Sequence, residues 1–509
     1  MLFTIALVGA VLALAYSLHI KIFSYWKRKG VPHEKPLPIV GNMKGVVKKY
    51  HFRDINQRIY EKFKGQGPIA GMYMFFKRTA LITDLDFIKQ VMIKDFSYFQ
   101  DRGAFNNPRD DPLTGHLFAL EGEEWRAMRH KLSPVFTSGK IKQMSKVIVD
   151  VGLRLGDAMD KAVKEAKVED GNVEVKDLCA RFTTDVIGSC AFGLECNSLQ
   201  DPSAEFRQKG REIFTRRRYS TVVQSFILTN AKLARKLRMK VLPDDLTQFF
   251  MSTVKNTVEY RLKNGIKRND FIEQMIELRA EDQEAAKKGK GIDLSHGLTL
   301  EQMAAQAFVF FVAGFETSSS TMSLCLYELA VQLEIQQRLR EEIESVLANV
   351  DGGELNYDVL AQMTYLDQVL SETLRKHPLL PHLIRETNKD YQIPNTDIVL
   401  DKGVLALIPV HNIHHDPEIY PEPEKFDPSR FDPEEVKNRH PMAYLPFGDG
   451  PRNCIGLRFG KIQAKIGLVS LLRRFKFSVS NRTEVPLIFS KKSFLLATDN
   501  GIYLKVESV

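Results

Sequence analysis

One segment near the C-terminus, PFGDGPRNCIGLRFG at residues 446–460, constrains the fold of this chain more than any other. It places Cys454, one of five cysteines in 509 residues, among Gly448, Gly450 and Gly456. Glycine has no Cβ, so it lets the backbone approach a ligand or another segment closely. Such a loop around one cysteine suits a ligand site, but an inert cysteine in a buried turn is the commoner arrangement.

The residues that follow the loop indicate a helix. Apolar residues recur at intervals of three and four at Ile455, Phe459, Ile462 and Ile466, which predicts a helix that starts at Cys454. The positive end of a helix lowers the pKa of a nearby thiol. We therefore expect Cys454 to be held as a thiolate.

The pattern of cysteines limits the metal chemistry that Cys454 could serve. The five cysteines are odd in number and lack C-x-x-C spacing, which predicts neither a disulfide framework nor a zinc cluster. A structural zinc needs four protein ligands, whereas haem iron needs one axial ligand, and a thiolate in that role favours O–O cleavage. In such a site Arg452 could bind a propionate and Phe447 could shield the sulfur.

Composition identifies a folded protein and leaves its partner class open. With 44% hydrophobic and 27% charged residues, the chain can form a large core. Its net charge of +9 and pI near 9.0 would suit an anionic membrane, an acidic protein or nucleic acid. No basic run is long enough to favour nucleic acid, so we expect no nucleic-acid partner.

The N-terminus predicts a membrane anchor. Residues 2–20 carry no acidic or basic side chain except His19, and as a helix they would cover the thickness of a bilayer core. A cleaved signal peptide is the alternative, but positive charge follows the apolar run instead of preceding it. The positive-inside rule therefore keeps the rest of the chain in the cytosol, with Tyr25 and Trp26 at the membrane interface. We divide the chain into an anchor at 1–20, a basic, proline-rich linker at 21–45 and a catalytic domain at 46–509.

A second unusual feature is a long apolar helix with polar residues in its middle. Thr299 and Gln302 form a capping-box pattern, and the apolar stretch that follows predicts a helix to about Leu333. The stretch AGFETSSS, residues 313–320, interrupts it. A kinked core helix would explain this pattern. The alternative is a ligand pocket, because Ala313 and Thr317 share one face of the helix and Gly314 beside them could leave a groove.

At this point the chain resembles the cytochrome P-450 superfamily. The cysteine-loop pattern of that family, F-x-x-G-x-R-x-C-x-G, is matched in full by Phe447, Gly450, Arg452, Cys454 and Gly456. The resemblance implies a mainly α fold with a smaller β region and one N-terminal transmembrane helix. It also implies haem b as the cofactor, with Cys454 as the axial ligand of the iron and Gly448 and Gly456 against the macrocycle.

Further motifs follow in the order that the family shows. Glu372 and Arg375 in SETLRKHP match E-x-x-R, which alone would be an ordinary helix ion pair, and Arg430 in the P-x-R-F stretch would complete a structural Glu-Arg-Arg network. AGFETS corresponds to the oxygen-binding helix. The resemblance thereby implies that Ala313 contacts the cofactor and that Thr317 and Glu316 deliver protons.

The resemblance also names partners for the haem propionates. Trp125 and Arg129 match W-x-x-x-R, which alone would be an amphipathic basic helix, and Arg385 and the looser candidate Arg102 occupy positions that related enzymes use. Stretches such as DDPLTGHLFALEGEEWR are similar to insect microsomal enzymes of family six.

The resemblance implies a haem-thiolate monooxygenase that inserts one atom of O₂ into lipophilic small molecules, such as xenobiotics, plant toxins, insecticides, hormones or endogenous lipids. GDGPRN at 448–453 lacks the third glycine of a dinucleotide-binding turn, so the electrons would come from NADPH through the membrane-bound NADPH–cytochrome reductase, with cytochrome b5 as an optional donor. The expected location is the cytoplasmic face of the endoplasmic reticulum membrane. The reductase would meet a basic surface, for which the candidates are Lys131, Lys140, Arg458, Lys461 and Lys465.

The substrate pocket is the least constrained prediction. Phe118, Phe310 and Phe494 fall near the substrate-contacting segments of the family, although aromatic residues are more often ordinary core. Three other functions stay open at this stage: a haem-thiolate isomerase or dehydratase that needs no reductase, a haem-binding sensor, and a membrane-anchored protein without haem. Dependence of turnover on NADPH would separate the first of these from a monooxygenase.

Overall fold

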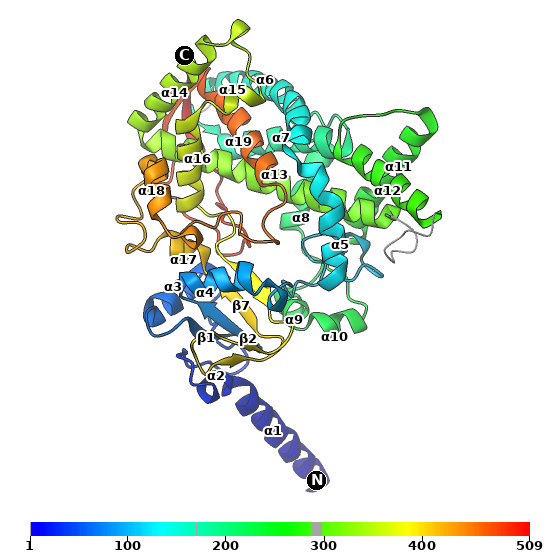
Figure 1. The fold of residues 1–509 in the computed structure, drawn as a ribbon. Helices are drawn as coiled ribbons and strands as arrows, with labels where there is room; N and C mark the ends of the chain where they lie inside the picture. Colours follow the sequence, from blue (N-terminus) through cyan, green and yellow to red (C-terminus); the bar gives the residue numbers. More distant parts are fainter. Residues whose placement is uncertain (1, 169–170, 288–297) are drawn as a thin grey trace.

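The computed structural model describes residues 2–168, 171–287 and 298–509. Figure 1 shows three parts: a single helix, α1, that extends away from the rest of the chain, a sheet region next to it, and a large helical body. The mainly α fold with a smaller β region is the one that the sequence predicted.

Helices make up most of the body and follow one another along the chain. Their bounds are α1 (Leu2–Phe23), α2 (Tyr25–Arg28), α3 (Phe52–Phe63), α4 (Leu85–Lys89), α5 (Gly122–Leu132), α6 (Ser138–Val168), α7 (Val175–Ile187), α8 (Glu205–Thr215), α9 (Thr221–Thr229), α10 (Ala231–Lys236), α11 (Asp244–Asn264), α12 (Phe271–Lys287), α13 (Leu300–Val331), α14 (Leu333–Ala348), α15 (Tyr357–Leu360), α16 (Thr364–Lys376), α17 (Val410–His414), α18 (Pro433–Asn438) and α19 (Leu457–Leu472).

Three small sheets complete the fold. The largest has the strand order β1 (Ile69–Met74), β2 (Lys77–Ile82), β7 (Leu405–Ile408) and β4 (Leu383–Glu386). Its β2–β7 pair is parallel and the other two pairs are antiparallel, so a hairpin from the N-terminal region joins strands from the C-terminal third. The second sheet contains β3 (Val173–Glu174), β9 (Tyr503–Ser508) and β8 (Phe475–Val479), and the third pairs β5 (Tyr391–Gln392) with β6 (Val399–Leu400).

Helix α13 runs through the centre of the helical body (Figure 1). The predicted capping box is confirmed: Thr299 Oγ1 accepts from the backbone N–H of Gln302, and the Gln302 side chain accepts from the N–H of Thr299. The helix ends at Val331, two residues before the predicted end. In the described part of the chain it is the helix long and apolar enough to cross a membrane, but most of its side chains are buried, which identifies it as the core helix.

Helix α1 differs from α13 because several of its apolar side chains are exposed. Phe3, Ile5, Leu14 and Tyr16 are among the most exposed large apolar residues of the described chain. The helix ends at Phe23 instead of at residue 20. The backbone hydrogen bond from Ser24 N to Ile20 O, followed by that from Arg28 N to Ser24 O, joins α1 to α2 and so to the rest of the protein.

Two aromatic residues that we predicted at the membrane interface are instead buried in the sheet region, and that prediction is wrong. Trp26 is 0% exposed, and its Nε1–H donates to Met72 O at 3.0 Å. The indole lies on Gly71, where an added Cβ would come within 2.4 Å of the ring. Tyr25 Oη accepts from the backbone N–H of Asp401 at 3.1 Å. These aromatic residues therefore join α1 to the sheet instead of contacting lipid.

Candidate active site

One face of α13 opens into the interior in the middle of an otherwise buried helix. Ala313 is exposed, and Val309, Val312 and Thr317 are half-buried, whereas most of their neighbours along the helix are buried. Val309, Ala313 and Thr317 are spaced four residues apart, so they lie above one another on the same face. The face predicted from Ala313 and Thr317 is therefore partly exposed, and Val309 and Val312, which the sequence did not reveal, adjoin it.

Gly314 has a different role from the one expected. An added Cβ there would lie 2.5 Å from Ile187 Cδ1 of α7. The glycine therefore allows α7 to pack closely against α13 and does not form the ligand groove. Residues 300–331 form one continuous helix through this point.

The polar residues of the motif are held by their own helix and by α7. Thr317 Oγ1 donates to Ala313 O at 2.5 Å, which is the usual bond of a helical threonine to the preceding turn. Its oxygen keeps a lone pair that can accept a hydrogen bond from a donor at the open face. Glu316 Oε1 lies 3.5 Å from Lys176 Nζ of α7 and accepts from Ser320 Oγ at 3.5 Å.

The cysteine loop is closed by its own backbone. Cys454 N donates to Phe447 O at 2.9 Å, and Asn453 N donates to Gly450 O at 3.1 Å. Gly450 has φ of 71°, and a Cβ there would lie 2.0 Å from Met92 O, so only glycine fits. A Cβ at Gly456 would meet no described protein atom within 4 Å, which leaves open space beside the loop.

Helix α19 begins at Leu457, three residues later than predicted, with Gly456 as its N-cap. The side chain of Cys454 is exposed, yet the surrounding protein is close enough that burial raises the pKa of its thiol. The Gly456 N–H and the positive charges of Arg102 and Arg129 oppose this rise but do not reverse it. Within the protein, desolvation therefore outweighs the contributions that favour the thiolate.

Four arginines gather beside the cysteine. Burial, followed by the charges of Arg385 and Arg452, holds the pKa of Arg102 well below its usual value. Burial, with the charge of Arg452, lowers the pKa of Arg385 to about 10. Burial also lowers the pKa of Arg452 to about 10, although the carboxylates of Asp101 and Glu121 oppose this shift. Four guanidinium groups close together beside one sulfur suit an anionic ligand.

Helix α5 and the cysteine loop hold these arginines in place. The guanidinium carbon of Arg452 lies 4.7 Å from the centre of the buried Trp125 ring, and its Nη1 donates to Gln100 O at 2.5 Å. Arg129 donates to Asn453 O at 2.9 Å and to Asn453 Oδ1 at 2.8 Å, directly before Cys454. The Nε atoms of Arg385 and Arg452 are buried and have no hydrogen-bond partner in the described structure.

Helix α13 packs against the start of α19. The rings of Phe310 and Phe459 are 5.2 Å apart, and a Cβ at Gly460 would lie 3.9 Å from Ser318 Oγ. Phe459 and Gly460 follow Cys454 by five and six residues. The segment from Ala313 to Thr317 therefore passes close to the helix that the cysteine loop begins.

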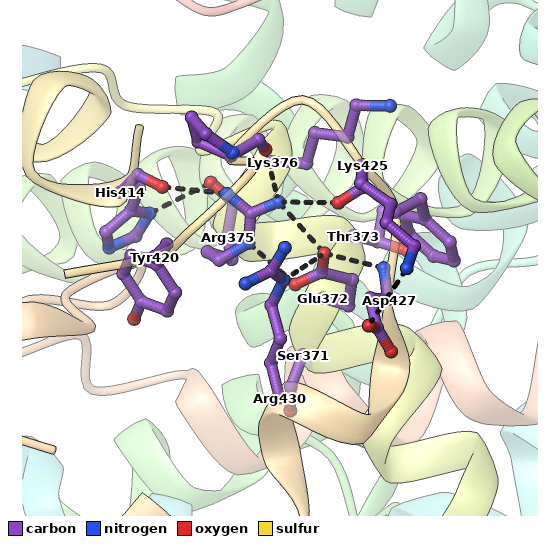
Figure 2. A network of polar contacts seen from close by, with 12 residues as sticks. Ser371, Glu372, Thr373, Arg375, Lys376, His414, Tyr420, Lys425, Asp427 and Arg430 are labelled. Carbon is purple, nitrogen blue, oxygen red and sulfur yellow. Dashed lines mark hydrogen bonds and ion pairs between the residues drawn. The ribbon is translucent and has the colours of Figure 1, made fainter. Parts of the chain in front are cut away.

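The structure brings Glu372, Arg375 and Arg430 together (Figure 2). Arg375 donates from Nε to Glu372 Oε2 at 2.7 Å and from Nη2 to Glu372 Oε1 at 2.9 Å, and both side chains are fully buried. Arg430 Nε lies 3.6 Å from Glu372 Oε1. Asp427 N also donates to that oxygen, at 2.9 Å, so the carboxylate joins α16 to the segment around Arg430.

This network extends to the chain that enters the cysteine loop. Arg375 Nη1 donates to His414 O at 2.7 Å. The ring of His414 accepts from Leu445 N through Nε2 at 2.9 Å and contacts Arg375 O through Nδ1 at 3.1 Å. Tyr444 Oη donates to Ser371 O at 3.1 Å. The residues just before the loop are thus fixed to α16 and α17.

The three predicted substrate phenylalanines lie in different surroundings. Phe118 is 39% exposed, in a loop whose adjacent residues are buried, and the Arg102 guanidinium lies 4.2 Å from its ring centre. Phe494 is 60% exposed and contacts the His382 ring. Phe310 is only 8% exposed and packs against Phe459 and other core aromatic residues, so its place on the substrate side is wrong.

The predicted basic surface loses two of its members. Lys465 is buried and donates to Leu360 O at 2.7 Å and to Asp367 Oδ2 at 2.9 Å. Lys131 Nζ lies 2.5 Å from Asp282 Oδ2. Arg458 is exposed, and burial lowers the pKa of Lys461.

Comparison with known proteins agrees with this arrangement. The family model for cytochrome P450 matches residues 31–506. The chain belongs to the cytochrome P450 family. It is 94% identical to "Probable cytochrome P450 6a14" of Drosophila melanogaster over the full length of both chains. It is 52% identical to "Probable cytochrome P450 6a13" of the same species, over 97% of each chain, and 47% identical to "Cytochrome P450 6A1" of Musca domestica, over 96% of this chain and 94% of that protein.

Membership identifies the enzyme as a cytochrome P450 monooxygenase with a haem-thiolate cofactor, of the insect family six that the sequence predicted. The described residues fit that cofactor. Cys454 offers one accessible sulfur ligand, the four arginines offer a positive site for two propionates, and open space adjoins Gly456. Cysteine supplies the electron donation that haem uses to cleave the O–O bond.

Proposed function

We propose that the enzyme oxidises lipophilic small molecules with one atom of O₂, and that its electrons come from NADPH through a membrane-bound flavin reductase. The observation that carries this proposal is the accessible sulfur of Cys454 beside the arginine cluster, next to a helix face formed by Val309, Val312, Ala313 and Thr317. An apolar face with one hydroxyl favours an apolar substrate and a localised proton path.

Each residue has a distinct part in the proposed reaction. Bound haem supplies the iron that binds and activates O₂. Cys454 would hold the iron, and Trp125, Arg129, Arg385 and Arg452 would hold the propionates. Thr317 Oγ1 would accept a hydrogen bond from a water molecule at the open helix face and hold that water as a proton donor, while Glu316, paired with Lys176, would pass protons from the α7 side. Ala313 and Val309 keep other water away from the reacting centre.

We further infer that α1 anchors the enzyme in the endoplasmic reticulum membrane, with the catalytic body in the cytoplasm. The support is the row of exposed apolar side chains on α1, followed by Lys21, Lys27, Arg28 and Lys29. The exposed Arg458 and the half-buried Lys140 remain candidates for contact with an acidic surface of the reductase or of cytochrome b5.

Reconstitution tests the proposed function directly. Purified enzyme in lipid vesicles is combined with NADPH–cytochrome reductase, NADPH and 7-ethoxycoumarin, and both NADPH consumption and product are measured. We expect product only when the reductase and NADPH are both present. Rearrangement or dehydration of an organic hydroperoxide at the same rate with and without reductase and NADPH would instead identify an isomerase or dehydratase.

A further inference from the structure

We propose that Gln306 is a substrate-positioning residue of this monooxygenase, acting through the loop segment Gly115–Phe118. The inference extends the proposed function, because it assigns control of how bulky ligands fit the site. Gln306 is 0% exposed on α13, in the otherwise apolar stretch MAAQAFVFF. A buried carboxamide is costly unless its oxygen and nitrogen are both hydrogen-bonded, so the contacts of this side chain need an explanation.

Both ends of the carboxamide bind one short loop segment. Gln306 Nε2 donates to Gly115 O at 3.1 Å, and Gln306 Oε1 accepts from Leu117 N at 2.9 Å. The two bonds flank His116, so one side chain holds the backbone on either side of that residue. This geometry replaces the pairing that a neighbouring strand would provide.

The clamp is on the same side of α13 as the open face. Gln306 precedes Val309 by three residues and Ala313 by seven, and such positions lie above one another on a helix. The side chain therefore fixes the distance between the loop segment and the helix face that carries Ala313 and Thr317.

The clamped segment carries two aromatic rings that are partly exposed. His116 lies between the two bonds and is half-buried, and its ring is 6.5 Å from the Phe308 ring of α13. Phe118 follows the clamp directly and is 39% exposed, although Leu117 and Ala119 beside it are buried. These two rings are the part of the loop that a ligand in the site can contact.

The same segment is joined to the arginine cluster. Phe118 O accepts from Arg102 Nη1 at 3.0 Å and from Arg452 Nη2 at 3.4 Å. The loop is also held at its base, where Asn106 Nδ2 donates to Ala119 O at 2.8 Å. The segment thus connects the arginines beside Cys454 with α13, to which the Gln306 clamp joins it by two hydrogen bonds.

The chain contains a matched control residue. Gln336 of α14 is also buried, at 3% exposure, and clamps a backbone segment in the same way. Its Nε2 donates to Leu329 O at 2.9 Å and to Phe477 O at 2.8 Å, and its Oε1 accepts from Phe477 N at 2.9 Å. Gln336 holds β8 and not the loop at 115–118. Replacing either glutamine by methionine therefore disrupts an equivalent buried clamp at a different place.

The experiment compares Q306M and Q336M holoenzymes with two iron-binding probes, imidazole and clotrimazole. Both probes ligate haem iron through an azole nitrogen, but only clotrimazole has a bulky aromatic group that reaches beyond the iron. Optical titration gives both dissociation constants, and hydrogen exchange of the peptide containing Leu117 reports the clamp itself. Neither measurement requires turnover, so failure of this proposal can be distinguished from failure of the proposed function.

We expect Q306M to weaken clotrimazole binding about tenfold while imidazole binding stays within about twofold, and to speed exchange at Leu117. Q336M should leave both affinities and the Leu117 exchange rate unchanged. If Q306M does not fold, Q306N and Q336N replace the pair, because the shorter amide cannot span both loop groups. Unchanged clotrimazole affinity with faster Leu117 exchange would overturn the proposal, as would identical behaviour of the two variants.

Discussion

On the Cys454 side of the site, buried ion pairs hold the chain in place. On the α13 side, hydrogen bonds between side chains and the backbone, together with aromatic contacts, do so. Glu372 and Arg375 are fully buried and joined by two hydrogen bonds, and they extend through His414 to the entry of the cysteine loop. On the α13 side, Gln306 and Arg102 hold a loop with an exposed Phe118. Substitutions on the Cys454 side should therefore destabilise the folded protein, whereas substitutions on the α13 side should change the site with little effect on stability.

The largest effect should come from breaking the ionic side. Glu372→Gln leaves the buried Arg375 and the half-buried Arg430 without their counter-charge, which costs about 3–5 kcal/mol of unfolding free energy. We expect the variant to lose haem during purification. Chemical denaturation and the haem-to-protein absorbance ratio measure both consequences, and a holoenzyme of wild-type stability would refute the structural role of the network.

Low pH should also destabilise the Cys454 side of the site. Burial, followed by the charges of His415 and Arg375, holds the pKa of His414 well below its usual value, and its Nε2 must be unprotonated to accept from Leu445 N. The unfolded chain binds a proton near pH 6.5 that the folded chain does not bind, so stability falls as pH decreases below that value. The slope is about 1.4 kcal/mol per pH unit for each such histidine.

Denaturation curves between pH 7.5 and pH 5 measure that slope in wild type and in His414→Asn. The asparagine cannot titrate, so its curve should be flatter than that of wild type, although its stability at neutral pH is lower. Parallel curves for the two proteins would show that His414 does not contribute to the acid sensitivity.

A pair of phenylalanines tests the boundary between core and site. Phe310→Leu should cost about 1.5 kcal/mol of stability, because Phe310 packs against Phe459 in the core, and should leave clotrimazole affinity unchanged. Phe118→Leu should change stability by less than about 0.5 kcal/mol but weaken clotrimazole binding. Weaker clotrimazole binding in Phe310→Leu, with unchanged binding in Phe118→Leu, would show that Phe310 contacts the ligand.

Replacing Thr317 should have the smallest effect on stability but should change the coupling of NADPH consumption to product formation. Thr317→Ala removes one bond to Ala313 O on an open helix face, so its stability should change by less than about 0.5 kcal/mol. The ratio of product formed to NADPH consumed should nevertheless fall several-fold, because water is no longer held for proton delivery. Thr317→Ser, which keeps the hydroxyl, serves as the control. Full coupling in Thr317→Ala would remove Thr317 from the proton path.

The comparison also shows which parts of the site could be predicted from sequence. Glu372 and Arg375 are three residues apart on one helix, and the cysteine loop is contiguous, so local spacing revealed both. Arg430 follows Glu372 by 58 residues, so the family resemblance alone connected them.

The loop side could not be predicted in the same way. Helix α13 is apolar on nearly all sides, and periodicity cannot tell which face opens, which is why Phe310 was misplaced and Val309 missed. Trp26 was assigned to the membrane because its flanking lysines favoured an interface, but Gly71 provides room for it on the sheet. Gln306 gave one signal, a single amide in an apolar run, which the sequence analysis did not use.

The central claim is that Cys454 is the protein ligand of the haem iron. The most direct test is the absorbance spectrum of the reduced, CO-bound protein for wild type and Cys454→Ser, with circular dichroism to verify the helical fold. Wild type should show the strongly red-shifted Soret band of a thiolate-ligated haem, and the serine variant should lack that band while its helices remain. A variant that keeps the red-shifted band would contradict the claim.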